Sequence, residues 1–400
     1  MQFDIVVVGA GPAGLAFAAS LAGSGLRLAL IEKLPEATLA DPGFDGREIA
    51  LTHLSMRLLR RLGAWERIPP ADISPLREAQ VLNGISSFAL RFDDEGKDDG
   101  PLGVLVPNHL IRRSLYEVVQ GLPEVTLLAG QMVASVQTSA QGATVGLADG
   151  RTIAARLVVG ADTRFSETRR RMGIPATMQD FGKSMLVCRM AHDRPHHAIA
   201  TEWFGYGQTF AILPLNGDGM EGDVSGVVLT LPAREMETVM ALEGPAFDAE
   251  ITRRYRHRLG AMRLVSTRHV YPLVGVFAQR FVATRFALVG DAAVGMHPVT
   301  AHGFNLGLRG ADSLAREIRE AIGRGRDVAD RRALARYQTD HMRASRPLYL
   351  ATNATALFYT DDRFPTRVLR AAALRLGSRL APFRRAVVAR LTEAGAARDA

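Results

Sequence analysis

The sequence contains a single cysteine, Cys188, among its 400 residues. One cysteine allows neither an intramolecular disulfide nor a CxxC redox pair, so dithiol chemistry is excluded. Long apolar runs are also missing, because stretches such as 5–8 and 157–159 are soon interrupted by glycine or charge. A membrane-spanning helix needs roughly 20 apolar residues, so we expect no span. The N-terminus begins with a strand pattern rather than a secretory signal, which predicts a cytoplasmic protein.

Acidic residues are absent from residues 363–390, which hold eight arginines. The formal charge of +8 is thus concentrated near the C-terminus, and we expect no nucleic-acid partner. Pro365 and Pro382 would limit a helix in this segment. Its apolar stripe comprises Leu369, Ala372, Ala373, Leu376 and Leu380. Either this helix packs on the body with solvated arginines, or its basic surface attracts anionic lipid headgroups or an acidic protein.

Spacings typical of metal ligands are missing as well. His53, His109 and the pair His196–His197 lack the acidic or cysteine neighbours of a metal site, so we predict no metal.

The first 33 residues predict a buried strand, a glycine turn, a helix and a second strand that ends in Glu32. Gly9, Gly11 and Gly14 provide the tight turn, the close approach to a pyrophosphate and the close helix–strand packing of a dinucleotide-binding motif. Glu32 can accept hydrogen bonds from both hydroxyls of an adenosine ribose. The alternative is a purely structural strand–turn–helix.

The stretch GDAAVGMHPVTAHGFNLGL, residues 290–308, follows the apolar strand pattern of 286–289. Asp291 would therefore lie at the carboxyl edge of a sheet, where ligands bind in such folds. The small residues after it let the chain pass close to a cofactor, and a helix begins near Gly303. The positive end of that helix suits the negative charge of a reduced flavin.

Four motifs in this order resemble the FAD-dependent aromatic hydroxylases of the p-hydroxybenzoate hydroxylase fold. They are the N-terminal fingerprint, FDGREIALTHLSMRLLRRLGAW (44–65), LVVGADTRFSETRRRMGI (157–174) and the stretch from 290. The resemblance spans roughly residues 1–345 and is nearest to the ubiquinone-biosynthesis hydroxylases, in particular the UbiM type. It implies FAD as the cofactor.

The resemblance also implies site residues. Asp291 would bind the ribityl chain of FAD, Arg47 would lie beside the cofactor, and Asp162 would serve both FAD and the nicotinamide donor. Arg47 could instead form a surface ion pair. The remaining residues expected at the cofactor are Arg112, Val133, Gly290, Gly303 and Asn305.

Three departures from the family pattern occur. The usual Asp-Gly pair is Asp162-Thr163, which raises the question of a turn with positive φ. The frequent Gly-Gln-Gly is Ala301-His302-Gly303, and a frequent histidine after the GDAA stretch is Val294.

The implied fold is α/β, with a Rossmann-like FAD-binding domain interleaved with an antiparallel-sheet substrate domain. The FAD-binding domain would comprise residues 1–72, 99–179 and 269–345, and the substrate domain 73–98 and 180–268. Alternating apolar residues within 180–268 support strands there. Residues 346–400 would form a basic helical region.

The implied reaction is hydroxylation of a polyprenylated phenol or quinol in ubiquinone biosynthesis. NAD(P)H reduces FAD, O2 adds at C4a, and the flavin hydroperoxide transfers a hydroxyl to the ring. The sequence has no second dinucleotide fingerprint, so the donor would dock transiently. The inner face of the membrane and other ubiquinone-biosynthesis proteins are further candidate partners; hydroxylation at ring position 1, 5 or 6 stays open.

His297 and His302 are the titratable candidates for polarising a phenol or relaying its proton near neutral pH, and Pro298 would shape the substrate side of the flavin. Alternatively, each histidine satisfies a loop carbonyl. Three aromatic residues line a pocket for a prenylated ring or are ordinary core: Trp203, Tyr206 and Phe210.

Rival functions stay open. The protein could hydroxylate another phenol, or belong to another flavoenzyme class such as the halogenases or amine oxidases. A halogenase would show Trp-x-Trp-x-Ile-Pro, whereas Trp65 and Trp203 lie far apart. A non-catalytic flavoprotein subunit of a biosynthetic complex would keep the binding motifs and use the basic tail for partners.

Overall fold

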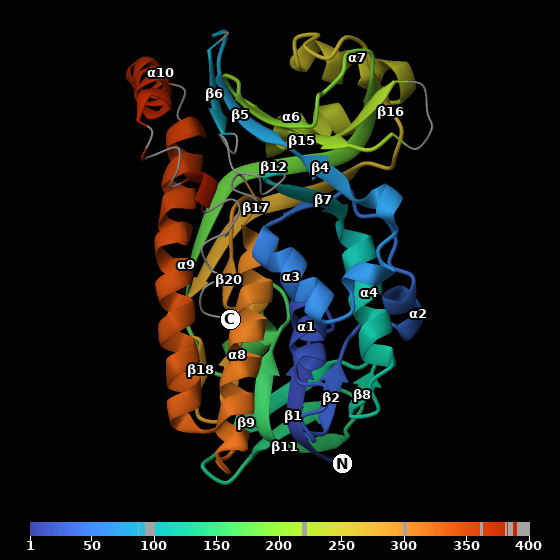
Figure 1. Cartoon of the computed structure of the whole chain (residues 1–400), viewed down its shortest axis with the longest axis vertical. Helices are drawn as coiled ribbons and strands as arrows, with labels where there is room; N and C mark the ends of the chain where they lie inside the picture. Colours follow the sequence, from blue (N-terminus) through green and yellow to red (C-terminus); the bar gives the residue numbers. More distant parts are fainter. Residues whose placement is uncertain are drawn as a thin grey trace.

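The computed structural model describes residues 1–86, 88–92, 101–217, 222–298, 302–360 and 363–380, together with 382 and 387–389. Two large sheets are stacked along the long axis of the molecule (Figure 1). We call the sheet that contains β1, with its helices, the lower lobe. The sheet that contains β12, with its helices, is the upper lobe. Strands from distant parts of the sequence form each lobe, as expected for an interleaved α/β fold.

The lower lobe has a parallel core in the order β19–β11–β1–β2–β8. Their bounds are β1 Gln2–Val8, β2 Leu28–Ile31, β8 Val125–Leu128, β11 Thr152–Gly160 and β19 Phe286–Leu288. Every residue of β2 is buried, as expected for a parallel strand covered on both faces. The antiparallel additions are β18 Val282–Ala283, β9 Val133–Thr138 and β10 Ala143–Leu147.

Helices cover the lower sheet. The helix α1 (Pro12–Ser20) packs against α4 (Asn108–Gln120) and α8 (Gly303–Gly323), and α8 packs in turn against α9 (Arg331–Thr360). Figure 1 shows α8 and α9 side by side along one flank. The shorter helices are α2 Glu36–Ala40, α3 His53–Arg61 and α5 Glu167–Arg171.

The upper sheet has the order β20–β17–β12–β15–β14–β13–β5–β6, with β16 beside β12. The bounds are β5 Glu78–Asn83, β6 Ala89–Phe92, β12 Ala176–His192, β13 Ile199–Phe204, β14 Thr209–Leu215, β15 Asp223–Pro232, β16 Met262–Leu264, β17 His269–Ala278 and β20 Val294–Gly295. One face packs on α6 (Ala233–Met240) and α7 (Gly244–Arg254) around a second apolar core. The opposite face points toward the lower lobe.

A small sheet connects the lobes. It consists of β3 Glu48–Leu51, β7 Gly103–Pro107 and β4 Ser74–Leu76. Short 3-10 helices are η1 Trp65–Arg67, η2 Pro70–Asp72 and η3 Gly290–Ala292.

Two features of the upper sheet differ from the sequence prediction. The predicted boundary at 269 would place β17 in the FAD-binding domain, but β17 pairs with β12 over most of its length. The sheet is also not purely antiparallel, because β5 and β13 are parallel neighbours. Both differences arise because strands that are distant in the sequence pair with each other. The alternation of apolar residues predicts a strand but not its partner.

The C-terminal helix α10 (Phe364–Arg379) lies beside β6; it ends before Pro382, as predicted, but it includes Pro365 in its first turn. Of the two alternatives for this segment, packing on the body holds for the helix but not for its predicted apolar stripe, because Leu369 and Leu376 are each 60% exposed. Leu374 packs instead, with Leu90 and Phe92 of β6. No helix in the described part of the chain is long and apolar enough to span a membrane. Of the predicted stretch 346–400, residues 361–362, 381, 383–386 and 390–400 lie outside the described residues.

Candidate active site

One cavity of about 1420 Å³ extends from the carboxyl ends of β1, β2 and β11 to the inner face of the upper sheet. Among the predicted site residues, only Gly14 does not line it. The predicted residues that do are Gly9, Gly11, Glu32, Arg47, Arg112, Val133, Asp162, Gly290, Asp291, His297, Pro298, His302, Gly303 and Asn305. Residues that are far apart in the sequence therefore share one space.

The glycine turn after β1 has little room for side chains. A Cβ on Gly14 would lie 2.0 Å from the carbonyl oxygen of Gly9, and one on Gly9 would lie 2.5 Å from that of Ala161. A Cβ on Gly11 would have no heavy atom within 4 Å, and Gly11 lines the cavity. No side chain caps the N-terminus of α1, so its first amides are available to an anion. The turn fits a pyrophosphate.

Glu32 is held at the cavity wall by the backbone. Its carboxylate accepts hydrogen bonds from the Ala10 amide at 2.8 Å and from the Leu34 amide at 3.0 Å. A carboxylate offers about four lone-pair positions, so acceptor capacity remains for a ribose.

Arg47 is anchored beside the cavity by a polar cluster. Its guanidinium pairs with Asp45 at 2.6 Å, and Asn108 donates to the same carboxylate at 2.7 Å. Burial alone would raise the pKa of Asp45, but Arg47 and Asn108 hold it below its ordinary value. Arg112 lines the same wall, and burial lowers its pKa. The ion pair and the place at the cavity, which were alternatives for Arg47, thus occur together.

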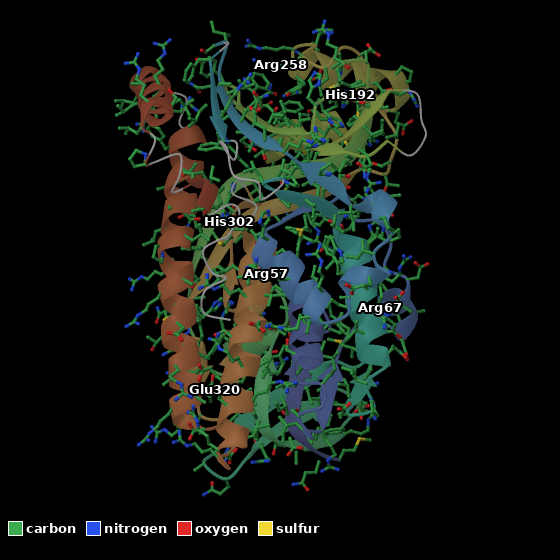
Figure 2. All side chains as sticks on the ribbon, viewed as in Figure 1. Arg57, Arg67, His192, Arg258, His302 and Glu320 are labelled. Carbon is green, nitrogen blue, oxygen red and sulfur yellow. The ribbon has the colours of Figure 1, made fainter. Side chains whose placement is uncertain are left out.

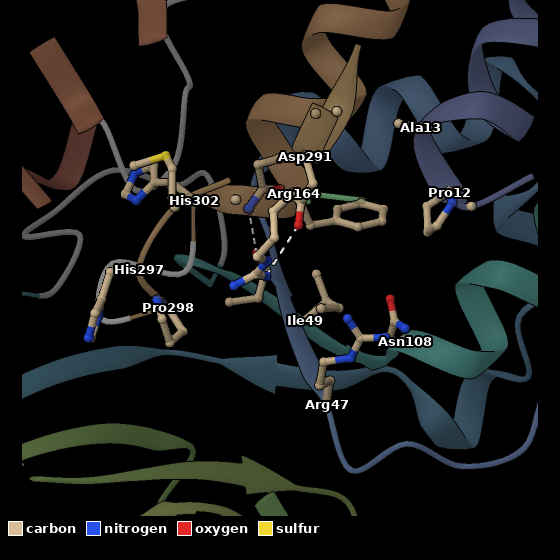
Figure 3. A pocket seen from close by; sticks show the side chains of 18 of the residues that line it. Pro12, Ala13, Arg47, Ile49, Asn108, Arg164, Asp291, His297, Pro298 and His302 are labelled. Atoms are coloured by element: carbon tan, nitrogen blue, oxygen red, sulfur yellow. Dashed lines mark hydrogen bonds and ion pairs between the residues drawn. The ribbon is translucent and has the colours of Figure 1, made fainter. Parts of the chain in front are cut away.

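The stretch after β19 turns sharply around α1. Gly290 has φ +61, and a Cβ there would lie 2.6 Å from the Cβ of Ala13. Asp291 follows in η3, where its carboxylate accepts a hydrogen bond from Arg164 at 3.2 Å (Figure 3). Arg164 also donates to the carbonyl of Val274 at 3.2 Å. Asp291 is therefore fixed at the edge of the sheet, as predicted from the sequence.

Asn305 joins the first turn of α8 to the strand β3. Its side chain accepts from the Thr52 amide at 3.1 Å and donates to the carbonyl of Ala50 at 2.8 Å. Gly303 begins the helix, as expected, with His302 at the N-cap position. The structure therefore gives Asn305 a role in positioning the cavity wall.

Asp162 binds its own loop. Its carboxylate accepts from the hydroxyl of Ser166 and from the Thr168 amide at the start of α5. Left-handed backbone among the described non-glycine residues occurs at five positions, and Thr163 is not one of them. The Asp-Thr departure therefore needs no positive φ.

His297, Pro298 and His302 lie together on one side of the cavity, across from Arg47 (Figure 3). The imidazole of His297 meets the ring of Phe181 edge-on at 4.7 Å. Burial, followed by the charges of Lys183 and Arg164, lowers the pKa of His297 to about 4. The prediction that His297 titrates near neutral pH is therefore wrong, since its imidazole is neutral there. His302 lies between the lobes (Figure 2).

The aromatic residues expected at the substrate lie elsewhere. Trp203 and Phe210 are fully buried under α6 and α7, so the alternative that they are ordinary core is correct for both. Tyr206 is 40% exposed and does not line the cavity. The cavity face of β13 and β14 instead carries Ala200, Glu202, Phe204, Thr209 and Ala211. The sequence showed that apolar residues alternate along β13 and β14. It did not show which of the two faces of these strands lines the cavity.

The other histidines have structural partners. His53 contacts the carbonyl of Pro101 at 2.9 Å, and His109 meets the ring of Phe44 edge-on. No group of three His, Cys, Asp or Glu side chains within the described ranges is placed to hold a metal ion. Cys188 is buried under α6 and α7, and burial raises the pKa of its thiol to about 12.

Comparison with known proteins agrees with this geometry. A family model described as an FAD binding domain matches residues 2–349. The chain is 46% identical over 396 residues to ubiquinone hydroxylase UbiM of Neisseria meningitidis, covering 98% of this chain and 85% of the relative. It is 34% identical over 383 residues to ubiquinone hydroxylase UbiL of Rhodospirillum rubrum, covering 96% and 87%.

Solved structures show the same fold. PqsL of P. aeruginosa in complex with 2-aminobenzoylacetate matches with a TM-score of 0.77 and 22% identity, covering 90% of this chain and 98% of that one. p-Nitrophenol 4-monooxygenase PnpA of Pseudomonas putida matches with a TM-score of 0.75 and 17% identity, covering 98% of both. The fold prediction is thereby confirmed.

The fold, the glycine turn and the family match define a flavin-dependent monooxygenase with FAD as its cofactor. Within that class, the chain belongs to the ubiquinone hydroxylase family. The resemblance stated from the four motifs is confirmed.

Proposed function

We propose that this protein hydroxylates a polyprenylated phenol or quinol in ubiquinone biosynthesis, with O2 as co-substrate. The observation that carries the proposal is the single cavity, which joins the glycine turn and Asp291 to a largely apolar sheet face. A separate cofactor cleft would leave no place for a ring and a prenyl chain beside the flavin. The names of the two relatives described above, both ubiquinone hydroxylases, favour the same substrate class.

Each cofactor residue receives a proposed role from its geometry. Gly9, Gly11 and the first amides of α1 hold the pyrophosphate, and Gly14 keeps the helix close to β1. The ribose hydroxyls are bound by Glu32, and the ribityl chain by Asp291. The residues proposed to wall the remaining cofactor surface are Arg47, Arg112, Val133, Asp162, Gly290, Gly303 and Asn305.

Bound FAD supplies the redox chemistry, taking electrons from NAD(P)H and activating O2 toward an electron-rich ring. The protein must orient that ring and exclude water. We assign this task to the side that carries His297, Pro298 and His302. The neutral imidazole of His297 can exchange one hydrogen bond with a phenol without adding a charge to the cavity.

We also propose that NAD(P)H docks transiently and that the lobes divide the work. The FAD-binding domain would comprise 1–72, 99–179 and 269–345, with β17 contributed to the substrate sheet. Oxidation rates with NADH and NADPH, measured with and without a prenylphenol, identify the donor.

The test of function uses a host that lacks its own ubiquinone hydroxylases. The wild-type chain should restore a hydroxylated prenylphenol in quinone extracts analysed by mass spectrometry, whereas Asp291→Ala should not. The position of the new hydroxyl identifies ring carbon 1, 5 or 6. If the wild-type protein carries FAD but leaves the intermediates unchanged, another phenol or a non-catalytic subunit role replaces this proposal.

We further propose that the protein binds peripherally to an anionic membrane surface through α10. Exposed Leu369 and Leu376 lie on the helix together with exposed Arg375 and Arg379, and exposed Leu380 follows directly. This combination of apolar and basic side chains suits the interface of an anionic bilayer. Leu374 on the same helix lines the cavity, so the membrane would adjoin the end where a prenyl chain enters.

Vesicle co-sedimentation tests this surface. The protein should bind vesicles containing phosphatidylglycerol more strongly than pure phosphatidylcholine, and the double variant Leu369→Asp, Leu376→Asp should lose that binding. Met178→Asp, at an exposed position of β12, is the control. Equal sedimentation of the double variant would contradict the proposal and favour an acidic protein partner for the helix.

A further inference from the structure

Glu202 is a carboxyl group that neither the cofactor roles nor the core explains. It lies on β13, where Trp203 faces the core under α6 and α7 and Glu202 faces the cavity. In the cross-strand pairing, Glu202 is opposite Val81 on one side and Ala211 on the other. The same row continues through Val228. Glu202 is thus the polar member of an otherwise apolar row.

This row leads to the proposed cofactor side of the cavity. Val228 is opposite Val187 on β12, and a Cβ on Gly46 would lie 2.6 Å from the Val187 side chain. Gly46 immediately precedes Arg47. Neighbouring strands are roughly 4.8 Å apart, so three spacings place Glu202 about 14 Å from β12 along the sheet. The cavity therefore has room for an aromatic headgroup between Glu202 and β12.

The carboxyl of Glu202 has no partner within the part of the chain that the structure describes. No hydrogen bond or ion pair to it is formed, although Thr201 next to it accepts from Gln80 at 2.8 Å. Its partial exposure is to the cavity interior, and burial raises the pKa of Glu202 to about 8. At neutral pH the group is mostly the neutral acid, with one donor and one acceptor to offer.

Within the described residues, the half-buried carboxyl of Glu202 forms no hydrogen bond or ion pair that would stabilise the fold. The fold therefore does not require a carboxyl group at this position. Ligand pockets have this composition, with apolar walls and a few polar groups that fix the orientation of the ligand.

We propose that Glu202 binds the hydroxyl-bearing headgroup of the substrate, donating to one ring oxygen and accepting from a ring hydroxyl. The inference rests on the proposed function for its substrate class, a prenylated phenol. Thr209 and Thr230, opposite each other in the adjacent row, offer hydroxyl groups on the same face. Glu202 would therefore share the orientation of the headgroup with the side that carries His297, Pro298 and His302, and the apolar remainder would hold the prenyl chain.

The experiment compares Glu202→Leu and Glu202→Gln in the purified FAD-loaded protein. The probe is 2-prenylphenol, whose binding is followed by the change in flavin absorbance, and KM and kcat are measured where turnover occurs. Glu202→Leu should weaken binding and raise KM by roughly ten- to hundredfold, since one polar contact is lost. Glu202→Gln keeps a donor and an acceptor and should stay within about threefold of wild type.

Two further readouts separate substrate binding from a structural role. The FAD content of Glu202→Leu should equal that of wild type, and its Tm should not fall, because the carboxyl has no partner among the described residues. A structural role would instead lower Tm. Glu237→Leu, on the exposed side of α6, controls for the loss of a carboxylate.

The outcomes distinguish this inference from the proposed function. If wild type and both variants bind the probe equally, or if wild type does not bind it at all, the role of Glu202 is overturned. If wild type binds the probe and Glu202→Leu does not, the role of Glu202 stands even when no hydroxylated product forms. That last result would overturn the proposed reaction alone.

Discussion

The predicted role of Asp291, binding the ribityl chain of FAD, can be measured directly. Its carboxylate already forms a charged hydrogen bond with Arg164, so it is held in place before any cofactor binds. A hydrogen bond to a charged group contributes about 2 kcal/mol, so Asp291→Ala should weaken FAD binding by roughly thirtyfold. Flavin titration of the apoprotein measures this. Asp312→Ala on α8, which removes an ion pair with Arg61 of α3, should leave FAD affinity unchanged.

Two buried histidines make stability depend on pH. Burial lowers the pKa of His297 and of His341 to about 4, against an ordinary value of 6.5. Between these values the unfolded chain binds protons that the folded chain does not, so the free energy of unfolding falls as pH decreases from 6.5 to 4. At pH 5 each histidine should account for about 2 kcal/mol.

Urea unfolding at pH 7 and pH 5 checks this pH dependence. His341→Gln and His297→Gln should each reduce the difference between the two pH values, whereas exposed His257→Asn should not. An unchanged difference in both buried-site variants would show that other groups cause the loss of stability in acid.

At the scale of elements, two glycines of the β1–α1 turn should have different effects when substituted. Gly11 should matter for FAD binding, and Gly14 for the stability of the fold. Gly11→Ala adds a methyl group where the structure has open space, so the apoprotein should keep its Tm. The same methyl group would lie where the pyrophosphate is proposed to bind, so FAD affinity should fall at least tenfold. Gly14→Ala places its methyl group against the carbonyl oxygen of Gly9 and should cost about 3 kcal/mol of stability. Thermal melts and flavin titrations of both variants test the contrast; equal affinity for FAD in Gly11→Ala would contradict it.

The elements predicted correctly from the sequence are those with local signals. The glycine turn of β1 and α1 and the strand–turn–helix around Asp291 each combine an apolar strand with glycines at fixed spacing. The parallel pairing of β5 with β13 has no such signal, because it joins residues more than a hundred positions apart. For α10, the sequence showed an amphipathic pattern but not which surface, body or solvent, receives the apolar stripe.

At the scale of the whole molecule, the site exists because two lobes share one cavity. Sequence motifs located the lower wall through Glu32, Asp162 and Asp291, which each follow a strand of the parallel sheet. The upper wall was predicted as a sheet, but not the side chains that line it, since the two faces of β13 are distinguished only by what packs on them. Trp203 was a plausible pocket residue and Glu202 was overlooked, although they are neighbours.

The shared cavity also predicts how ligands stabilise the molecule. FAD at a hundredfold excess over Kd should add about 2.7 kcal/mol to the free energy of unfolding, seen as a rise in Tm of a few degrees. Hydrogen exchange should slow first in the lower wall, at residues 9–15 and 302–308, because these segments contain residues proposed to bind the cofactor. Subsequent addition of 2-prenylphenol should slow exchange in β13 and β14, while α7 on the far face of the sheet stays unchanged. Protection of α7 with no change in β13 would mean that the phenol binds outside the cavity. That result would contradict the proposal that the lower lobe binds FAD and the upper sheet binds the substrate.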